Sequence, residues 1–129
     1  IESTFLEIPA PEAEIPFTLS GLGAFPDLKK PSVIWAGLNA DNDMMGRLYK
    51  NVERFTANFR FREDKREFIP HLTLARLKSG RKITGDLLKY LEKNRDTVYG
   101  QSAFTRLTLY SSRLTSEGAS YTALKTISF

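Results

Sequence analysis

Short β-prone runs follow one another along this chain of 129 residues, and only two helical patterns interrupt them. Parallel strands need long crossover connections, usually helices, so this order predicts strands that pair mainly antiparallel. The predicted strands cover residues 3–8, 16–22, 31–38, 68–77, 103–111 and 119–127. The predicted helices cover residues 42–58 and 84–95, where apolar side chains recur at spacings of three and four. The expected fold class is therefore α+β, with a largely antiparallel sheet and about two helices.

The limits of these elements follow from residues that favour turns and caps. Two prolines end the first run, and the glycines and proline of residues 21–26 break the second into a loop. Asp41 or Asn42 is a good N-cap for the first helix, and residues 79–80, Ser-Gly, end the strand before the second helix. Residues 115–118, Thr-Ser-Glu-Gly, predict a turn that joins the last two strands as a hairpin.

Composition narrows the class of protein. Hydrophobic residues make up 41% of the chain and charged residues 26%, which is ordinary for one globular domain and excludes a disordered or coiled-coil chain. No apolar run approaches the roughly 20 residues that span a bilayer, and the first residues are acidic where a secretory signal would be basic. We therefore expect a cytoplasmic protein with no transmembrane helix.

The chain has no cysteine and a single histidine. Without cysteine there is no disulfide framework and no thiolate nucleophile, and one histidine excludes a histidine-rich metal cage within the chain. We expect neither a metal nor another cofactor.

Charge is unevenly distributed. The formal net charge is +4, but residues 1–53 balance to −4, residues 54–95 to +7 and residues 96–129 to +1. Clustered Lys and Arg attract phosphate-bearing partners, so the basic middle segment is a candidate interface for nucleic acid or nucleotide. The alternative is that its basic side chains are solvated loop residues: Arg60, Arg62, Lys65, Arg66, Lys78, Arg81 and Lys82.

The segment PHLTLAR holds the best candidate for a reactive site. Side chains of a strand alternate between its faces, so His71 and Thr73 are expected to share one exposed face while Leu72 and Leu74 anchor the strand in the core. An imidazole moves protons near neutral pH, and a threonine hydroxyl donates to an anionic oxygen. The same pair is also common as an ordinary structural feature, and the residues alone leave both interpretations open. Strict alternation places Arg76 on the face opposite His71.

The same segment resembles the second H-x-T-x motif of the two-histidine (2H) phosphoesterases, in particular of the RNA 2′,3′-cyclic phosphodiesterases, also called 2′–5′ RNA ligases. Residues 17–25 and 31–37 resemble the middle strands of that family, and residues 109–124 resemble its C-terminal hairpin. The resemblance covers residues 16–129. It implies a LigT-like fold of two lobes, each of which contributes one motif strand to a cleft between them.

The chain departs from the family pattern because it holds one histidine where the family has two motifs. Its opening, IESTFLEIPAPE, resembles the first strand of the family but runs almost directly into the middle strands. We therefore expect residues 1–129 to form a single domain of this type with an internal deletion near residues 12–16, which leaves one lobe incomplete.

In that family, RNA with a 2′,3′-cyclic phosphate end binds between the lobes, and no metal is required. One histidine activates water as general base, the other protonates the departing ribose oxygen, and the threonines hold phosphate oxygens. The resemblance makes His71 the base and Thr73 a phosphate donor.

Other site residues follow less directly from the resemblance. Arg76 is a lower-ranked candidate for neutralising the phosphate, because alternation turns it away from His71. Tyr110 and Arg113 lie in the matching hairpin and are candidates for substrate or RNA binding, with a core or surface role as the alternative. Trp35 is expected to be a core residue rather than a platform for stacking bases.

Three functions remain open. The chain is an RNA cyclic phosphodiesterase that needs the missing segment for full activity, a binding module for RNA or nucleotide phosphate, or an inactive structural remnant. A monomer is the expected state. A homodimer that brings two copies of His71 and Thr73 together is the alternative, because the absent lobe contact would leave apolar surface exposed.

Overall fold

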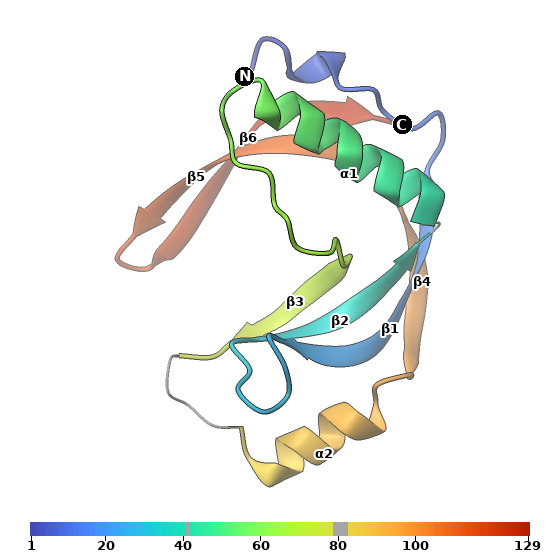
Figure 1. The fold of residues 1–129 in the computed structure, drawn as a ribbon, viewed down its shortest axis with the longest axis vertical. Coiled ribbons are helices and arrows are strands. Elements are labelled where there is room, and N and C mark those ends of the chain that lie inside the picture. The colour runs from blue at the N-terminus through green and yellow to red at the C-terminus, as the bar shows by residue number, and fades with distance from the viewer. Residues whose placement is uncertain (41, 79–82) are drawn as a thin grey trace. The chain divides into compact units, whose positions relative to one another are not determined.

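The computed structural model describes residues 1–40, 42–78 and 83–129. They form, in order, η1 (Phe5–Glu7), β1 (Ile15–Phe25), β2 (Val33–Ala40), α1 (Asn42–Ala57), β3 (His71–Arg76), α2 (Gly85–Lys93), β4 (Val98–Phe104), β5 (Arg106–Thr115) and β6 (Gly118–Ser128) (Figure 1). The pairs β1–β2, β2–β3 and β5–β6 are antiparallel, which confirms the α+β class. Within the described ranges, no helix has the length and apolar character needed to cross a membrane.

The chain divides into two compact units. Unit 1 comprises residues 1–15, 42–67 and 103–129, and contains η1, α1 and the β5–β6 hairpin. Unit 2 comprises residues 16–41 and 68–102, and contains α2 and most of a four-stranded sheet in the order β3-β2-β1-β4.

The register of the sheet in unit 2 sorts its side chains into two faces, because residues directly opposite each other in an antiparallel pair point to the same side. One face, called the apolar face below, carries Phe17, Leu19, Leu22, Ala24, Ile34, Ala36, Leu38 and Leu72. The other, called the His71 face, carries Thr18, Ser20, Gly23, Phe25, Val33, Trp35, Gly37, Asn39, His71, Thr73 and Arg76.

The helix α2 belongs to unit 2. Its Leu91 is only 2% exposed, as is Ala36 on the apolar face. The C-terminal end of α2 is tied to β1, since Leu22 N–H donates to Asn94 O at 3.1 Å. Thr84 caps the other end of α2 by accepting a hydrogen bond from the backbone N–H of Leu87 at 3.3 Å. We infer that α2 covers part of the apolar face, where a buried leucine has apolar partners.

The exposure of the two leucines in β3 contradicts one expectation. Leu72 and Leu74 are 48% and 53% exposed, so they do not anchor the strand in the core. The reason is that β3 is the edge strand of the sheet. Leu72 lies at the margin of the apolar face, and Leu74 has no partner on β2.

Unit 1 is built on the helix α1, which confirms the helix expected over residues 42–58. Met45 and Leu48 are buried on its apolar side, and Phe55 packs edge-on against Phe5 with ring centroids 6.1 Å apart. The expected hairpin is also confirmed, since Thr115 pairs with Gly118 at the end of β5–β6. Asp41 and the Ser79–Gly80 end signal lie outside the described residues.

Three expectations about the elements are wrong. Residues 3–8 form no strand but contain the short helix η1, and the buried residues are Phe5 in this helix and Ile8 directly after it. Gly21 and Gly23 do not end β1, which continues to Phe25. The strand expected at residues 103–111 is two strands, β4 and β5, because β4 begins five residues earlier at Val98 and ends at Phe104.

Burial of Leu91 gives a test of how α2 is held. We expect Leu91→Ala to lower the free energy of unfolding by about 2–5 kcal/mol, since it leaves a cavity under the helix. Tyr90→Ala is the matched control: Tyr90 is 57% exposed on the same helix, and its truncation should change stability by no more than about 0.5 kcal/mol. Urea denaturation measures both, and equal effects of the two variants would contradict the packing of α2.

Candidate functional site

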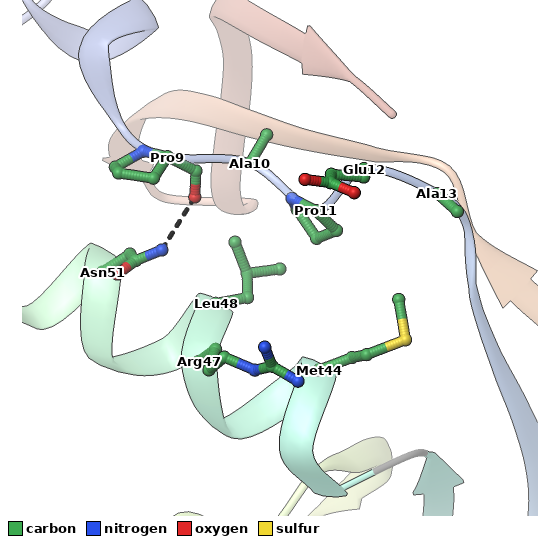
Figure 2. Close-up of a pocket in the computed structure, with 9 residues that line it drawn as sticks. All are labelled: Pro9, Ala10, Pro11, Glu12, Ala13, Met44, Arg47, Leu48 and Asn51. Atoms are coloured by element: carbon green, nitrogen blue, oxygen red, sulfur yellow. Dashed lines mark hydrogen bonds between the residues drawn. The ribbon is translucent and has the colours of Figure 1, made fainter.

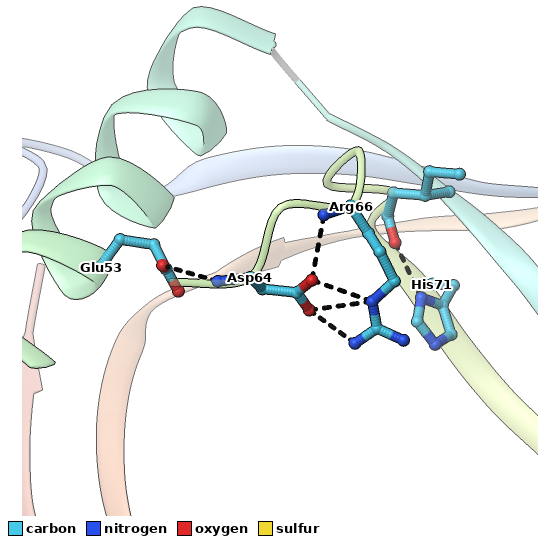
Figure 3. Close-up of polar contacts among 5 residues, drawn as sticks. Glu53, Asp64, Arg66 and His71 are labelled. Carbon is cyan, nitrogen blue, oxygen red and sulfur yellow. Dashed lines mark hydrogen bonds and ion pairs between the residues drawn. The ribbon is translucent and has the colours of Figure 1, made fainter. Parts of the chain in front are cut away.

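His71 is the first residue of β3 and directly follows Pro70, a residue tolerated at strand starts because it has no N–H to donate. The Pro70 carbonyl accepts a hydrogen bond from Leu38 N–H at 3.1 Å, which holds this entry to the strand. The His71 ring is exposed, and its Nδ1 lies 2.7 Å from Ile69 O (Figure 3). A carbonyl oxygen only accepts, so Nδ1 is the donor in this contact, and in the neutral imidazole the lone pair is then on Nε2.

Thr73 shares the His71 face, as the sequence predicts. The register places Thr73 opposite Trp35 and His71 opposite Gly37, two residues further along β2. Residues separated by two in a strand lie about 7 Å apart. Thr73, which is half-buried, therefore presents its hydroxyl two residues along the strand from the imidazole.

Arg76 also lies on the His71 face, against the expectation from strict alternation. Trp35 pairs with Thr73 while Ile34 pairs with Ala75, so β3 holds one extra residue, Leu74, at this point. Such a β-bulge shifts every later side chain to the other face. Arg76 consequently pairs with Val33 and joins Thr73 on the same side.

Two aromatic rings border His71 on this face. The Phe25 and His71 ring centroids are 5.0 Å apart with an interplanar angle of 82°, and those of Trp35 and His71 are 6.3 Å apart. Trp35, expected as a core residue, is half-buried, and it packs against Phe25 on the His71 face. Sequence reasoning missed Phe25, because Gly21 and Gly23 were interpreted as the end of the strand.

A second polar pair extends the same face. The Asn39 amide donates to the Ser20 hydroxyl at 2.6 Å. Gly37 on β2 pairs with Ser20 on β1 and with His71 on β3, so Ser20 and His71 lie at the same level of the sheet. The face therefore combines an imidazole, hydroxyls, an amide and a guanidinium. These groups suit a phosphate-bearing ligand that requires one proton transfer. The described ranges contain no group of three His, Cys, Asp or Glu side chains able to hold a metal ion.

Tyr110 and Arg113 belong to unit 1 and stand on the hairpin. Both are exposed, and the register pairs Tyr110 with Ala123 and Arg113 with Ser120. Residues three apart in a regular strand point to opposite faces, so one face of the hairpin presents only one of the two. Their assignment to substrate binding stays a prediction.

The basic residues between α1 and β3 differ in their surroundings. Arg60, Arg62 and Lys65 are exposed. Arg66 is paired with Asp64: its Nε donates to the carboxylate oxygens at 2.9 and 3.1 Å, and its backbone N–H donates at 3.0 Å (Figure 3). Arg66 is thus partly neutralised where it stands. Arg81 and Lys82 lie outside the described residues.

A pocket of about 490 Å³ lies in unit 1, between the extended chain that follows η1 and one side of α1 (Figure 2). The Asn51 amide bridges its two walls by donating to Pro9 O at 2.8 Å. Its lining is Pro9, Ala10, Pro11, Glu12, Ala13, Met44, Arg47, Leu48 and Asn51. The pocket adjoins the position of the expected internal deletion and holds none of the predicted site residues.

Comparison with known proteins relates this geometry to a family. The family model described as the 2'-5' RNA ligase superfamily matches residues 1–115. An RNA 2',3'-cyclic phosphodiesterase of Aquifex aeolicus is 36% identical over an alignment of 115 residues that covers 86% of this chain and 60% of that protein. A protein of the same name from Aeropyrum pernix is 37% identical over 106 residues, which are 82% of this chain and 60% of that protein.

The fold has a counterpart among solved structures. The crystal structure of the protein TT0787 of Thermus thermophilus superposes with a TM-score of 0.69 at 24% sequence identity, over 98% of this chain and 66% of that one. This likeness supports the α+β fold. The chain spans only 60% of the length of the two sequence relatives above.

The Asp64–Arg66 pair gives a prediction for the basic loop. The side-chain hydrogen bonds of Arg66, and then its backbone N–H, lower the pKa of Asp64 from 3.8 to about 2. A depressed carboxyl pKa stabilises the fold above about pH 4, and this contribution is lost as the pH falls through about 2. We expect Arg66→Ala to return the pKa of Asp64 towards 3.8 in a carboxyl NMR titration.

The neighbouring Lys65→Ala is the control for that titration, because Lys65 is not among the groups that lower the pKa of Asp64. It should leave the Asp64 titration unchanged. An equal shift in both variants would mean that general loop charge, rather than the Arg66 hydrogen bonds, depresses the pKa.

Proposed function

Because the chain belongs to the 2'-5' RNA ligase superfamily, we propose that it acts on the 2′,3′-cyclic phosphate ends of RNA as a phosphodiesterase, with His71 as general base. Relatives that share 36% and 37% of their aligned residues carry the name RNA 2',3'-cyclic phosphodiesterase. Thr73 and Arg76 are the groups that would hold the phosphate.

The observation that carries this proposal is the arrangement of β3. His71, Thr73 and Arg76 share one face of the sheet, and the hydrogen bond from His71 Nδ1 to Ile69 O leaves Nε2 directed away from the backbone as a proton acceptor. A base with an available lone pair, with a hydroxyl two residues along the strand and a guanidinium further along the same face, matches the needs of water attack on a phosphodiester.

The proposed step is a hydrolysis. Nε2 of His71 takes a proton from water as the water oxygen forms a bond to phosphorus. One bond between phosphorus and a ribose oxygen breaks, that oxygen takes a proton from solvent water, and Nε2 later returns its proton to solvent, so that a phosphomonoester and a free hydroxyl result. Thr73 and Arg76 stabilise the negative charge on the remaining phosphate oxygens during this change.

The departing ribose oxygen also needs a proton donor. His71 is the single histidine of the chain, so a second imidazole cannot fill this role within one copy. Loss of one member of an acid–base pair reduces rate by about 10²–10⁴. We therefore propose slow turnover for this chain, and fast turnover only where a second proton donor is supplied.

Replacement of His71 tests the assignment. We expect His71→Ala to lower hydrolysis of a 2′,3′-cyclic phosphate oligonucleotide by at least about 100-fold, because no base remains to activate water. Circular dichroism should be unchanged, since the ring is exposed. The assay uses protein whose measured mass matches the 129-residue sequence, and Lys89→Ala on α2 is the control that should keep full turnover. Unchanged turnover in His71→Ala would refute the base assignment.

A second candidate function is supported by the single histidine: a module that binds RNA or nucleotide phosphate without turning it over. In this case, affinity for a cyclic-phosphate oligonucleotide should fall as salt rises, because Lys and Arg contacts release counterions. Charge reversal at Arg60, Arg62, Arg81 and Lys82 should weaken binding and flatten its salt dependence, whereas Lys89→Glu should not. Salt-independent affinity would assign the four residues to solvated loops.

A further inference from the structure

We propose that Phe25, supported by Trp35, is a positioning residue that holds the His71 imidazole in one orientation and one tautomer. The restraint on the ring follows from the packing of unit 2 alone. Its consequence for catalysis rests on the proposed function.

Ring geometry is the first observation. Phe25 meets His71 edge to face, with centroids 5.0 Å apart and planes at 82°, an arrangement that aromatic pairs favour. The Trp35 ring lies near both, with its centroid 5.1 Å from that of Phe25 and 6.3 Å from that of His71. The imidazole plane therefore cannot turn freely without losing this contact.

The backbone makes room for these rings at two glycines. Gly23 is the cross-strand partner of Trp35, and a Cβ on Gly23 would overlap the indole ring. Gly37 is the partner of His71 and also lies under Trp35: a Cβ there would sit 2.6 Å from Ser20 O and 3.7 Å from the indole. The aromatic group is thus seated on positions that carry no side chain.

A β-bulge in β1 places Phe25 on the same face of the sheet as His71. In β1, Ser20 pairs with Gly37 while Leu22 pairs with Ala36, so Gly21 is an extra residue with a φ of 75°. Without it, Phe25 would lie on the apolar face with Phe17 and Leu19, because residues separated by an even number of positions in a regular strand share one face. The bulge moves Phe25 to the His71 face.

Two restraints then act on different parts of the imidazole. The hydrogen bond to Ile69 O fixes the Nδ1 corner, and the Phe25 contact fixes the plane of the ring. A free imidazole side chain prefers its proton on Nε2. Holding the ring so that Nδ1–H reaches the carbonyl favours the opposite tautomer, which leaves Nε2 free to accept a proton.

The tautomer can be measured directly, because His71 is the single histidine and gives one set of imidazole signals. In ¹⁵N NMR, above the range in which free imidazole titrates, we expect the wild-type ring to be mainly protonated on Nδ1. Phe25→Leu should raise the fraction protonated on Nε2 at least twofold, and Phe25→Tyr, which keeps the ring, should restore the wild-type spectrum.

Phe59→Leu is the matched control, since it makes the same change of side chain in unit 1, where Phe59 packs on Phe55. Circular dichroism checks folding, and Phe25→Met, which fills more of the vacated volume, replaces Phe25→Leu if that variant does not fold. An unchanged imidazole spectrum on loss of the Phe25 ring, or the same change in Phe59→Leu, would overturn the proposal.

Kinetics separate this inference from the proposed function. Where the protein hydrolyses cyclic phosphate, Phe25→Leu should lower kcat about tenfold with little change in KM, because the base is misplaced and the phosphate contacts remain. A shifted tautomer in a protein without turnover would leave the positioning role standing and refute the proposed function. Turnover in a protein whose Phe25→Leu variant shows no tautomer shift would refute the positioning role and leave the proposed function standing.

Discussion

Antiparallel pairing of β2 with two bulged neighbours is the constraint on which the candidate site depends. β1 carries an extra residue at Gly21 and β3 carries one at Leu74. Beyond each bulge, the side chains of that strand alternate in the opposite sense relative to β2. As a result, Phe25 and Arg76 both lie opposite Val33, on the side that carries His71. With regular pairing, both would point to the apolar face, and the His71 face would lose both the Phe25 ring and the Arg76 guanidinium.

The bulge in β1 is in turn fixed by the segment that follows α2. Gly21 N–H donates to Thr97 O at 2.9 Å, and a Cβ at Gly21 would lie 2.5 Å from Arg95 O. A φ of 75° adds to this, because the left-handed region costs L side chains roughly 1–2 kcal/mol. Glycine is required here both by conformation and by space, so the end of α2 sets the face on which Phe25 emerges.

These dependences explain what the sequence could predict. The helix α1, the β5–β6 hairpin and the shared face of His71 and Thr73 follow from local periodicity, and the structure confirms them. The face of Arg76 could not be predicted, because nothing in the residues around Leu74 marks a bulge and only pairing with β2 reveals it. At Gly21 a signal exists, but a glycine in a strand pattern indicates either a break or a bulge, and the partner strand decides. Residues 3–8 are β-prone, yet Phe5 is buried in a short helix and Ile8 directly after it, because tertiary packing overrides a weak local preference.

The distribution of unfavourable features gives a separate argument for function. A glycine inside a strand costs roughly 0.5–1 kcal/mol relative to alanine, and Gly23 and Gly37 both stand on the His71 face. The Nε1 of Trp35 is buried and finds no hydrogen-bond partner within the described ranges, a defect that costs on the order of 1–3 kcal/mol. A phenylalanine at this position would avoid that cost but would leave part of the space over Gly23 unfilled. Features that reduce stability without improving the core are expected where a surface is shaped for another purpose, and here they surround the one imidazole of the chain.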